Sequence, residues 1–157
     1  MPLPLRNLYE RLVRPALFQL PPETAQGVVD LVLSWERAWT TLYPSLHVEQ
    51  QLGVEWCGMT LRNPVGLAAG FDKDCLRLAS LAALGFGYVT CGTVTEHPLP
   101  GNPKPRLIRL AGEESLLNAM GFPNKGVASA ARHIEAARGR MNSTPVIVSI
   151  SGTSPAE

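Results

Sequence analysis

Residues 69–73 bring a carboxylate and a cation together with small side chains, in the order Ala69, Gly70, Phe71, Asp72 and Lys73. They follow an apolar run, and ligands of parallel α/β folds bind where such buried strands end. Small residues let a planar or phosphorylated ligand approach the backbone closely. Only three of the 14 basic residues are lysines, so a lysine at this point favours an anionic ligand. A tight turn with a surface lysine is the alternative.

Two more polar side chains, Thr93 and Ser149, end apolar runs further along the chain. If these runs are parallel strands, their ends share one edge of the sheet and can reach one ligand. A further candidate is the loop of Asn118, Ala119, Met120, Gly121 and Phe122. The amide of Asn118 can both donate and accept, as reading the imide edge of a heterocycle requires. An ordinary turn asparagine is the alternative.

The segments between these positions predict an α/β fold with a parallel sheet, because strands and helices alternate along the chain. Strands are expected at 65–71, 88–94 and 145–151, helices at 75–84 and 124–140, an exposed strand at 106–110 and a β-hairpin at 54–61. The later helix is expected to turn five side chains inward: Val127, Ala130, Ala131, Ile134 and Ala137.

Residues 1–45 predict a separate helical extension, followed by a domain over 46–157. Apolar side chains recur at helical spacing before Pro21-Pro22 and again from Glu23 to Trp39. The two helices would form a hairpin with much apolar surface for its size. Either the hairpin packs on the following domain, or it serves as a module for a membrane surface or an apolar ligand.

Composition and missing motifs exclude several classes of function. The 157 residues suit one domain, 45% of them are hydrophobic, and the net charge of +1 predicts no nucleic-acid partner. The three cysteines and three histidines lack metal-ligand spacing, which predicts no metal site and favours reduced thiols in a cytosolic protein. We expect neither a membrane-spanning helix nor a secretory signal. Walker phosphate loops and hydrolase nucleophile elbows are absent from the sequence.

Four segments, in order, resemble the N-terminal part of a quinone-dependent (class 2) dihydroorotate dehydrogenase. They are YERLVRPALFQL (9–20), CGMTLRNPVGLAAGFDKD (57–74), GFGYVTCGTVTEHPLPGNPKPRLIRL (85–110) and SLLNAMGFPNKG (115–126). The first is similar to the helical extension of that class, the next two to its first and second strand regions, and the last to its orotate-contacting loop. The soluble class 1 enzymes are disfavoured, because they lack the helical extension.

The resemblance implies an FMN-binding TIM-type (β/α)₈ barrel, incomplete at its C-terminus in this chain. The implied reaction oxidises dihydroorotate to orotate, the fourth step of de novo pyrimidine (UMP) biosynthesis. Hydride passes to the flavin, which a quinone then re-oxidises. Residues 1–40 would form the quinone entrance and make a peripheral, reversible contact with the cytoplasmic side of the inner membrane.

The resemblance also implies roles for the candidate residues. FMN would be bound by Ala69, Gly70, Phe71, Asp72, Lys73, Thr93 and Ser149, and the substrate by Lys73, Asn118, Ala119, Met120, Gly121 and Phe122. Lys73 would lie between the flavin and the substrate carboxylate. Asn118 would pair with the polar edge of the pyrimidine ring.

Two departures from the family pattern bear on activity. Ser149 stands where the family has Asn in an N-x-G-K-N context, and its side chain is shorter. The serine that acts as general base in the class would lie beyond Glu157, so no catalytic residue is assigned in this chain. Three strands cannot close a barrel. We therefore expect the chain alone neither to bind FMN tightly nor to turn over. A non-catalytic remnant that binds a membrane surface or a partner is the alternative.

Overall fold

The computed structural model describes residues 7–42, 52–141 and 143–152. The chain divides into two compact units, each described by itself below. Unit 1 combines Met1–Val32 with Pro103–Ala119, and unit 2 combines Leu33–Asn102 with Met120–Glu157. The predicted boundary between residues 45 and 46 falls outside the described residues.

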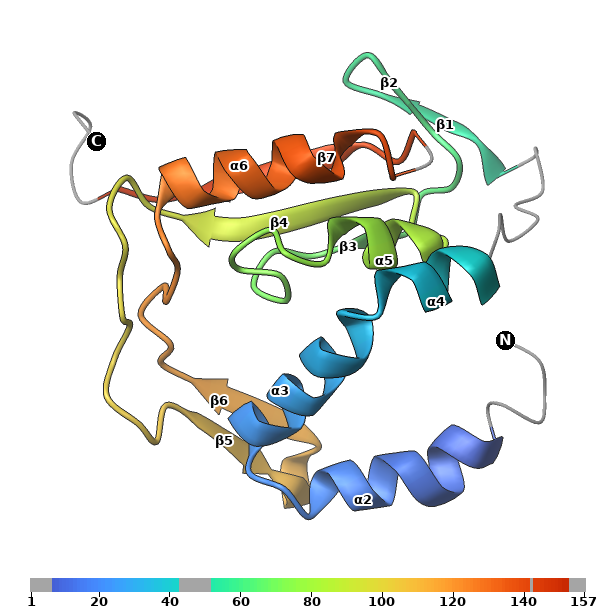
Figure 1. The fold of residues 1–157 in the computed structure, drawn as a ribbon. Helices are drawn as coiled ribbons and strands as arrows, with labels where there is room; N and C mark the ends of the chain where they lie inside the picture. Colours follow the sequence, from blue (N-terminus) through green and yellow to red (C-terminus); the bar gives the residue numbers. More distant parts are fainter. Residues whose placement is uncertain (1–6, 43–51, 142, 153–157) are drawn as a thin grey trace. The chain divides into compact units, whose positions relative to one another are not determined.

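A three-stranded parallel sheet forms the centre of unit 2, in the order β3 (Gly66–Leu67), β4 (Tyr88–Val94) and β7 (Val146–Ile150). Helices α5 (Leu78–Ala83) and α6 (Val127–Arg138) lie on the same side of this sheet (Figure 1). Helices on one side of parallel strands are the arrangement that βα units produce. The predicted α/β fold with a parallel sheet is confirmed.

The core of unit 2 lies between α5 and β4. Leu78, Leu81, Val89 and Cys91 are each no more than 1% exposed. Every residue of α5 is buried, and its alanines and serine let the helix approach the sheet closely. Burying a side chain of leucine or valine size stabilises a fold by about 1.5–3 kcal/mol. This contact is therefore the main source of stability in unit 2.

A hairpin at the start of unit 2 packs on the first residues of the sheet. Strands β1 (Val54–Trp56) and β2 (Met59–Leu61) pair antiparallel, as predicted. The two turn residues between them both have positive φ, which suits a tight two-residue hairpin. Trp56 stacks on Tyr88 with ring centroids 6.0 Å apart. The Tyr88 ring fills the space over Gly66, where a Cβ would lie 2.1 Å from it.

Two elements of unit 2 are shorter than predicted. The strand expected at 65–71 is reduced to Gly66–Leu67. The helix expected from Cys75 begins at Leu78. Asp72 explains the delay, since its carboxylate accepts the N–H groups of Leu76 and Arg77, each at 2.8 Å. The segment is thereby held in a turn before the helix starts.

Helix α6 begins at Val127, where position 124 was predicted. Gly126 has φ +80°, a left-handed conformation that helical residues do not adopt. Of the five side chains predicted to point inward, Ala130 and Ala137 are buried and Ile134 is half-buried, whereas Val127 and Ala131 are exposed. The prediction for those two is wrong. The His133 ring bonds the Asp74 backbone oxygen at 2.7 Å and turns a different face of the helix inward.

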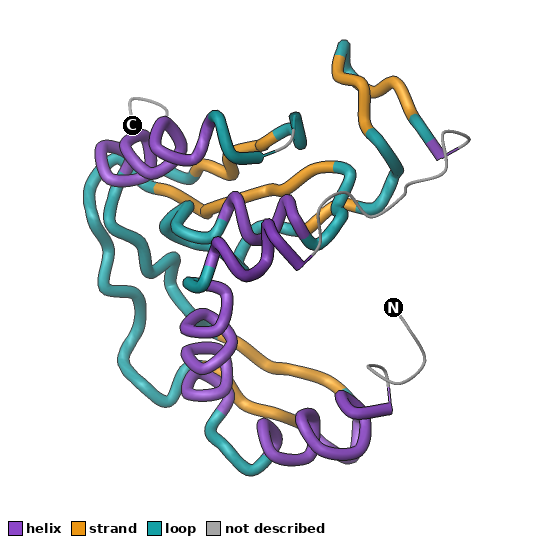
Figure 2. The backbone as a smooth tube through the Cα atoms, turned by 45° about the vertical axis from the view of Figure 1, so that its right-hand side comes forward, coloured by secondary structure: helices purple, strands orange, loops and turns teal. Residues whose placement is uncertain are grey.

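Unit 1 is built from helices and a two-stranded ribbon. A π-helical turn (Tyr9–Val13) continues into α2 (Arg14–Phe18), and α3 (Pro22–Leu33) follows. Strands β5 (Leu107–Leu110) and β6 (Ser115–Asn118) pair antiparallel around a short 3₁₀ turn (Ala111–Glu113). Figure 2 shows the ribbon running beside α2 and α3. Strand β5 was predicted; β6 was not, because its residues had been assigned to a loop.

The helix predicted from Glu23 to Trp39 is interrupted. It forms α3, which ends at Leu33, and α4 (Glu36–Leu42) in unit 2. The Ser80 hydroxyl donates to the Leu33 carbonyl oxygen at 2.7 Å and takes the place of a helical N–H. The next helix starts with the Trp35 carbonyl oxygen, which accepts from Ala38. Within the described residues, no helix is both long enough and apolar enough to cross a membrane.

Candidate functional site

The loop that follows β3 is fixed to the neighbouring strand by two backbone hydrogen bonds. Gly70 donates to the Gly92 oxygen at 2.8 Å, and Gly92 donates to the Asp72 oxygen at 2.9 Å. Both glycines have φ +97°, a conformation that other residues rarely adopt. No atom lies within 4 Å of a Cβ built at Gly70. The loop is therefore rigid at Gly92 and open at Gly70.

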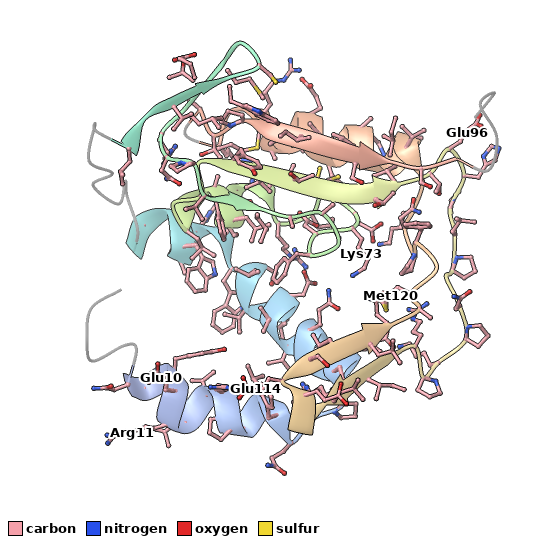
Figure 3. All side chains as sticks on the ribbon, turned by 180° about the vertical axis from the view of Figure 1, so that it is seen from behind. Glu10, Arg11, Lys73, Glu96, Glu114 and Met120 are labelled. Atoms are coloured by element: carbon pink, nitrogen blue, oxygen red, sulfur yellow. The ribbon has the colours of Figure 1, made fainter. Side chains whose placement is uncertain are left out.

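The far side of the same loop is held by the segment leading into α6. The Asp74 carboxylate accepts the backbone N–H of Lys125 at 2.8 Å, and the Asp74 carbonyl bonds His133. Asp72 is buried, and Asp74 is held by its hydrogen bond from Lys125. The backbone of Lys73, which lies between them, is therefore held in place. Lys73 is half-buried. Its side chain extends away from the strands (Figure 3).

Thr93 and Ser149 meet at this edge of the sheet, as their strand-end positions predicted. Their hydroxyl oxygens are 2.9 Å apart and share a hydrogen bond. A side chain at Gly92 would come within 2.5 Å of the Ser149 carbonyl oxygen, so glycine is required for the strands to approach this closely. The structure therefore brings Ala69 to Lys73, Thr93 and Ser149 to one edge of unit 2.

Two buried thiols, Cys75 and Cys91, lie close together in unit 2. Cys75 and Cys91 are almost completely inaccessible. A hydrogen bond with Cys91, together with burial, raises the pKa of the Cys75 thiol far above its ordinary value. Cys91 in turn donates to the Ile147 carbonyl oxygen at 3.6 Å. Thiols without access to solvent pack as small core residues. No cluster of metal-ligating side chains occurs in the described part of the chain.

The predicted substrate loop runs from one unit into the other. Met120 and Gly121 are anchored in unit 2 by Asn102, whose N–H donates to the Met120 oxygen at 3.0 Å. Phe122 is 53% exposed and has φ +49°. Asn118 belongs to β6 of unit 1, where it pairs with Leu107 and is exposed. Ala119 donates to the Arg106 oxygen in the same unit.

Sequence reasoning missed Asn124, which positions part of this loop. Its side-chain amide donates to the Phe122 oxygen at 2.8 Å and to the Thr95 hydroxyl at 2.9 Å. Its carbonyl oxygen accepts from the N–H groups of Thr95 and Gly126. Asn124 is buried and ties Phe122 to the residue that follows β4. The only signal in the sequence is its place in a Pro-Asn-Lys-Gly turn.

A separate pocket of about 600 Å³ lies inside unit 1. Arg14, Phe18 and Gln26 line it from the helices, and Leu107 and Arg109 line it from the ribbon. Most of its wall is apolar. A pocket of this size and lining suits a drug-sized apolar molecule with a polar group at one end.

Within unit 1, an ion pair joins the first turn of α3 to the segment directly before β5. Glu23 in the first turn of α3 accepts from the Arg106 guanidinium at 3.0 Å, and Lys104 lies 3.5 Å away. Partial burial acts to raise the pKa of the Glu23 carboxyl, but Arg106 and then Lys104 outweigh it and lower that pKa. The negative charge at the start of α3 also suits the helix dipole.

Comparison with known proteins decides the family. A family model described as "Dihydroorotate dehydrogenase" matches residues 51–157. This chain belongs to the dihydroorotate dehydrogenase family. The resemblance found in the four sequence segments is thereby confirmed. The roles of the individual site residues stay predictions.

Curated relatives carry the name dihydroorotate dehydrogenase (quinone). The protein of Chloroflexus aurantiacus is 43% identical, over 91% of this chain and 40% of the relative. That of Methylococcus capsulatus is 48% identical, over 77% and 36%. A solved structure of the Eimeria tenella enzyme with ferulenol matches with a TM-score of 0.69 and 34% identity, over 82% of this chain and 35% of that one. This chain thus spans about two fifths of the length of such relatives.

Proposed function

We propose that this chain forms the N-terminal part of a quinone-dependent dihydroorotate dehydrogenase. Such an enzyme oxidises dihydroorotate to orotate with FMN, in pyrimidine biosynthesis. The observation that carries the proposal is the shared sheet edge at which the 69–73 loop meets Thr93 and Ser149. The family match and the names of the relatives support it. The parallel strands with helices on one side fit the first part of a (β/α)₈ barrel.

The residues at this edge fit a flat, anionic cofactor such as FMN. Gly70 leaves open space over the backbone. Its N–H is held by the hydrogen bond to the Gly92 oxygen in β4. Lys73 supplies a positive charge, and the hydroxyls of Thr93 and Ser149 supply polar hydrogens at neighbouring strand ends. When bound, FMN would supply the two-electron redox chemistry. Ala69 to Asp72 would bind it through the backbone, while Lys73 would orient the substrate carboxylate against it.

The proposed substrate contacts come from residues 118–122. Met120, Gly121 and Phe122 would cradle the pyrimidine ring from unit 2, where Asn102 and Asn124 hold their backbone. Asn118 and Ala119 are assigned to the same substrate through the family motif. Because Ser149 already bonds Thr93, its shorter side chain would replace the family's asparagine only in part.

We propose that unit 1 receives the quinone in its apolar pocket. Exposed apolar side chains on the surrounding helices support a peripheral contact with the cytoplasmic side of the inner membrane. Leu12 and Leu31 are both more than 60% exposed. Such a contact would be reversible, because amphipathic helices lie in the interface without crossing it.

The isolated 157-residue chain is expected to be inactive. Strand β7 ends the described sheet, and its Ile150 side chain is 77% exposed. A further parallel strand would pair with the backbone of β7, as barrel closure requires. A non-catalytic module that binds a membrane surface or a partner is the second candidate function, favoured by the exposed helices of unit 1.

The intact mass of the protein purified from its own cells separates these two candidates. A mass well above 17.0 kDa, with bound FMN and quinone-dependent oxidation of dihydroorotate, supports the enzyme. A mass of 17.0 kDa without flavin supports the non-catalytic module.

Lys73 provides the sharper test in the complete enzyme. We expect Lys73→Met to lower the rate of dihydroorotate oxidation about 10²–10³-fold, the usual loss when a charge that stabilises a transition state is removed. FMN content, measured by absorbance, should fall much less than the rate. Arg132→Met, which removes an exposed cation from α6, should leave the rate unchanged. Equal losses in the two variants would contradict the role of Lys73.

A further inference from the structure

Cys75 and Cys91 bring two sulfur atoms together inside unit 2. Cys91 lies in the middle of β4, and Cys75 lies in the turn that precedes α5. Their side chains are 0% and 1% exposed respectively, and a hydrogen bond joins the two thiols. The backbone keeps the turn against the strand, because the Asp72 carbonyl oxygen accepts the N–H of Gly92, next to Cys91, at 2.9 Å. Two thiols in contact can become a disulfide when two electrons are removed.

The two thiols of this pair are not equivalent. Cys75 donates in the hydrogen bond between them, which lowers the pKa of Cys91 and raises the pKa of Cys75. The thiolate is the nucleophilic form of cysteine. Cys91 is therefore the sulfur that can attack an electrophile, and Cys75 is the neighbouring sulfur that can react with the product.

The turn over the pair lies at the surface of unit 2. Phe71 and Leu76, which flank it, are each 39% exposed. Cys75 has φ +58°, a left-handed conformation that residues with a Cβ rarely adopt. The Asp72 carboxylate maintains this conformation by accepting the N–H groups of Leu76 and Arg77. Opening of the turn alone, without unfolding of the sheet, would expose both sulfurs to a small oxidant.

We propose that Cys75 and Cys91 form an oxidation site, at which hydrogen peroxide converts the thiol pair into a disulfide. The deprotonated Cys91 sulfur attacks one peroxide oxygen, the O–O bond breaks, and the departing hydroxide takes up the proton lost by Cys91. The Cys75 sulfur then attacks the sulfur of the sulfenic acid, the S–O bond breaks, and a second water leaves with the Cys75 proton. Two thiols and one peroxide thus give one disulfide and two waters.

The disulfide would tie the turn that carries Lys73 to the strand that carries Thr93. Oxidation would thereby restrict the loop at the edge of the sheet. The oxidation itself is independent of the proposed function, because it needs only these two side chains and peroxide.

The test exposes the folded, fully reduced chain to a small excess of hydrogen peroxide at neutral pH. The remaining thiols are then blocked in denaturant, and the chain is digested with trypsin without reduction. Trypsin leaves Cys75 on peptide 74–77 and Cys91 on peptide 78–106, so the disulfide joins two separate peptides. Mass spectrometry should find them joined, with the loss of two hydrogens. Hydrogen exchange at the Gly92 amide should slow at least about ten-fold, because the cross-link opposes opening of the turn.

Cys57→Ser is the matched control. Cys57 is the exposed cysteine, and its replacement should leave the yield of the 75–91 link unchanged. The unaltered chain in urea is the second control. There, links 57–75 and 75–91 should form in similar amounts, because both close similar lengths of unfolded chain. In the folded chain, link 75–91 should be at least about ten-fold more abundant than link 57–75, since only that pair is held in contact.

The order of attack is tested with dimedone, which labels sulfenic acids. Cys75→Ser keeps a hydroxyl donor beside Cys91, so Cys91 should be labelled after peroxide treatment. In Cys91→Ser, Cys75 should be labelled at least about five-fold less, because its sulfur has no such donor and stays protonated.

Two results would overturn the oxidation site: no link between peptides 74–77 and 78–106 in the folded chain, or a 75–91 link no more abundant than the 57–75 link. Both use the unaltered chain, so they stand even if a serine variant fails to fold. Stronger dimedone labelling of Cys75 than of Cys91 would contradict the assigned order of attack.

Discussion

The two units use their apolar residues in opposite ways. In unit 2, Leu81 and Val89 are 1% exposed and a helix packs tightly on a sheet. In unit 1, Leu12 and Leu31 are 64% and 62% exposed, and Ala25 is the only buried hydrophobic residue among those described there. Polar contacts hold unit 1 together, chiefly the Glu23–Arg106 ion pair and the hydrogen bonds from the Arg109 guanidinium to the Leu17, Phe18 and Leu20 carbonyl oxygens at the end of α2. Unit 2 is therefore a folded core with the proposed site at its edge, whereas unit 1 leaves most of its large apolar side chains exposed.

Deleting one leucine from each unit gives the largest contrast. Leu81→Ala should lower the free energy of unfolding by about 2–5 kcal/mol, because it leaves a cavity in a close-packed core. Leu12→Ala should change it by less than about 0.5 kcal/mol, as exposed substitutions usually do. Urea unfolding followed by circular dichroism measures both. Similar losses would mean that unit 1 has a core like that of unit 2.

Two asparagines sharpen the contrast for polar residues. Asn124→Ala removes four hydrogen bonds in unit 2 and leaves buried backbone groups unpaired. We expect a loss of about 2–3 kcal/mol in unfolding free energy, and faster hydrogen exchange at Thr95 and Gly126. Asn118→Ala in unit 1 changes an exposed side chain and should cost less than about 0.5 kcal/mol. Unchanged exchange at Thr95 would show that Asn124 does not hold the loop.

The Glu23–Arg106 pair gives the smallest and most pH-dependent effect. Glu23→Gln should cost about 0.5–1 kcal/mol at neutral pH, the range of a partly exposed ion pair. The folded-state pKa of Glu23 is lowered, so the stabilisation is complete above the ordinary carboxyl pKa and is lost as the pH falls through the folded value. The difference between Glu23→Gln and the unaltered chain should therefore vanish in acid. Glu135→Gln breaks the more exposed Glu135–Arg138 pair and should show little effect at any pH.

The sequence predicted those parts of the molecule that depend on local pattern. Strand β4 follows its predicted range from Tyr88 to Val94, because its apolar run is bounded by glycines and polar residues. The hairpin at 54–61 could be predicted because only Cys57 and Gly58 separate its two strands. The loop after β3 and the two strand-end hydroxyls were found because parallel strands bring their ends together.

What the sequence could not predict depends on distant residues. Strand β6 exists because it pairs with β5, and its four residues are all exposed. The break before α4 depends on the Ser80 hydroxyl, 47 residues from Leu33. Asn124 looks like a turn residue until its partners Thr95 and Phe122 are known. In each case hydrogen bonds to another segment override the local preference.

The stack of Tyr88 on Trp56 allows the unit 2 sheet to be followed by intrinsic fluorescence. Tyr88 can pass excitation to an indole 6.0 Å away, so its own emission is quenched while β3, β4 and the hairpin stay in register. The Tyr88 ring can take this position because Gly66 has no Cβ; a Cβ there would lie 2.1 Å from the ring. Recovery of tyrosine fluorescence would thus report the separation of these strands without any attached dye, at the end of the sheet away from Thr93 and Ser149.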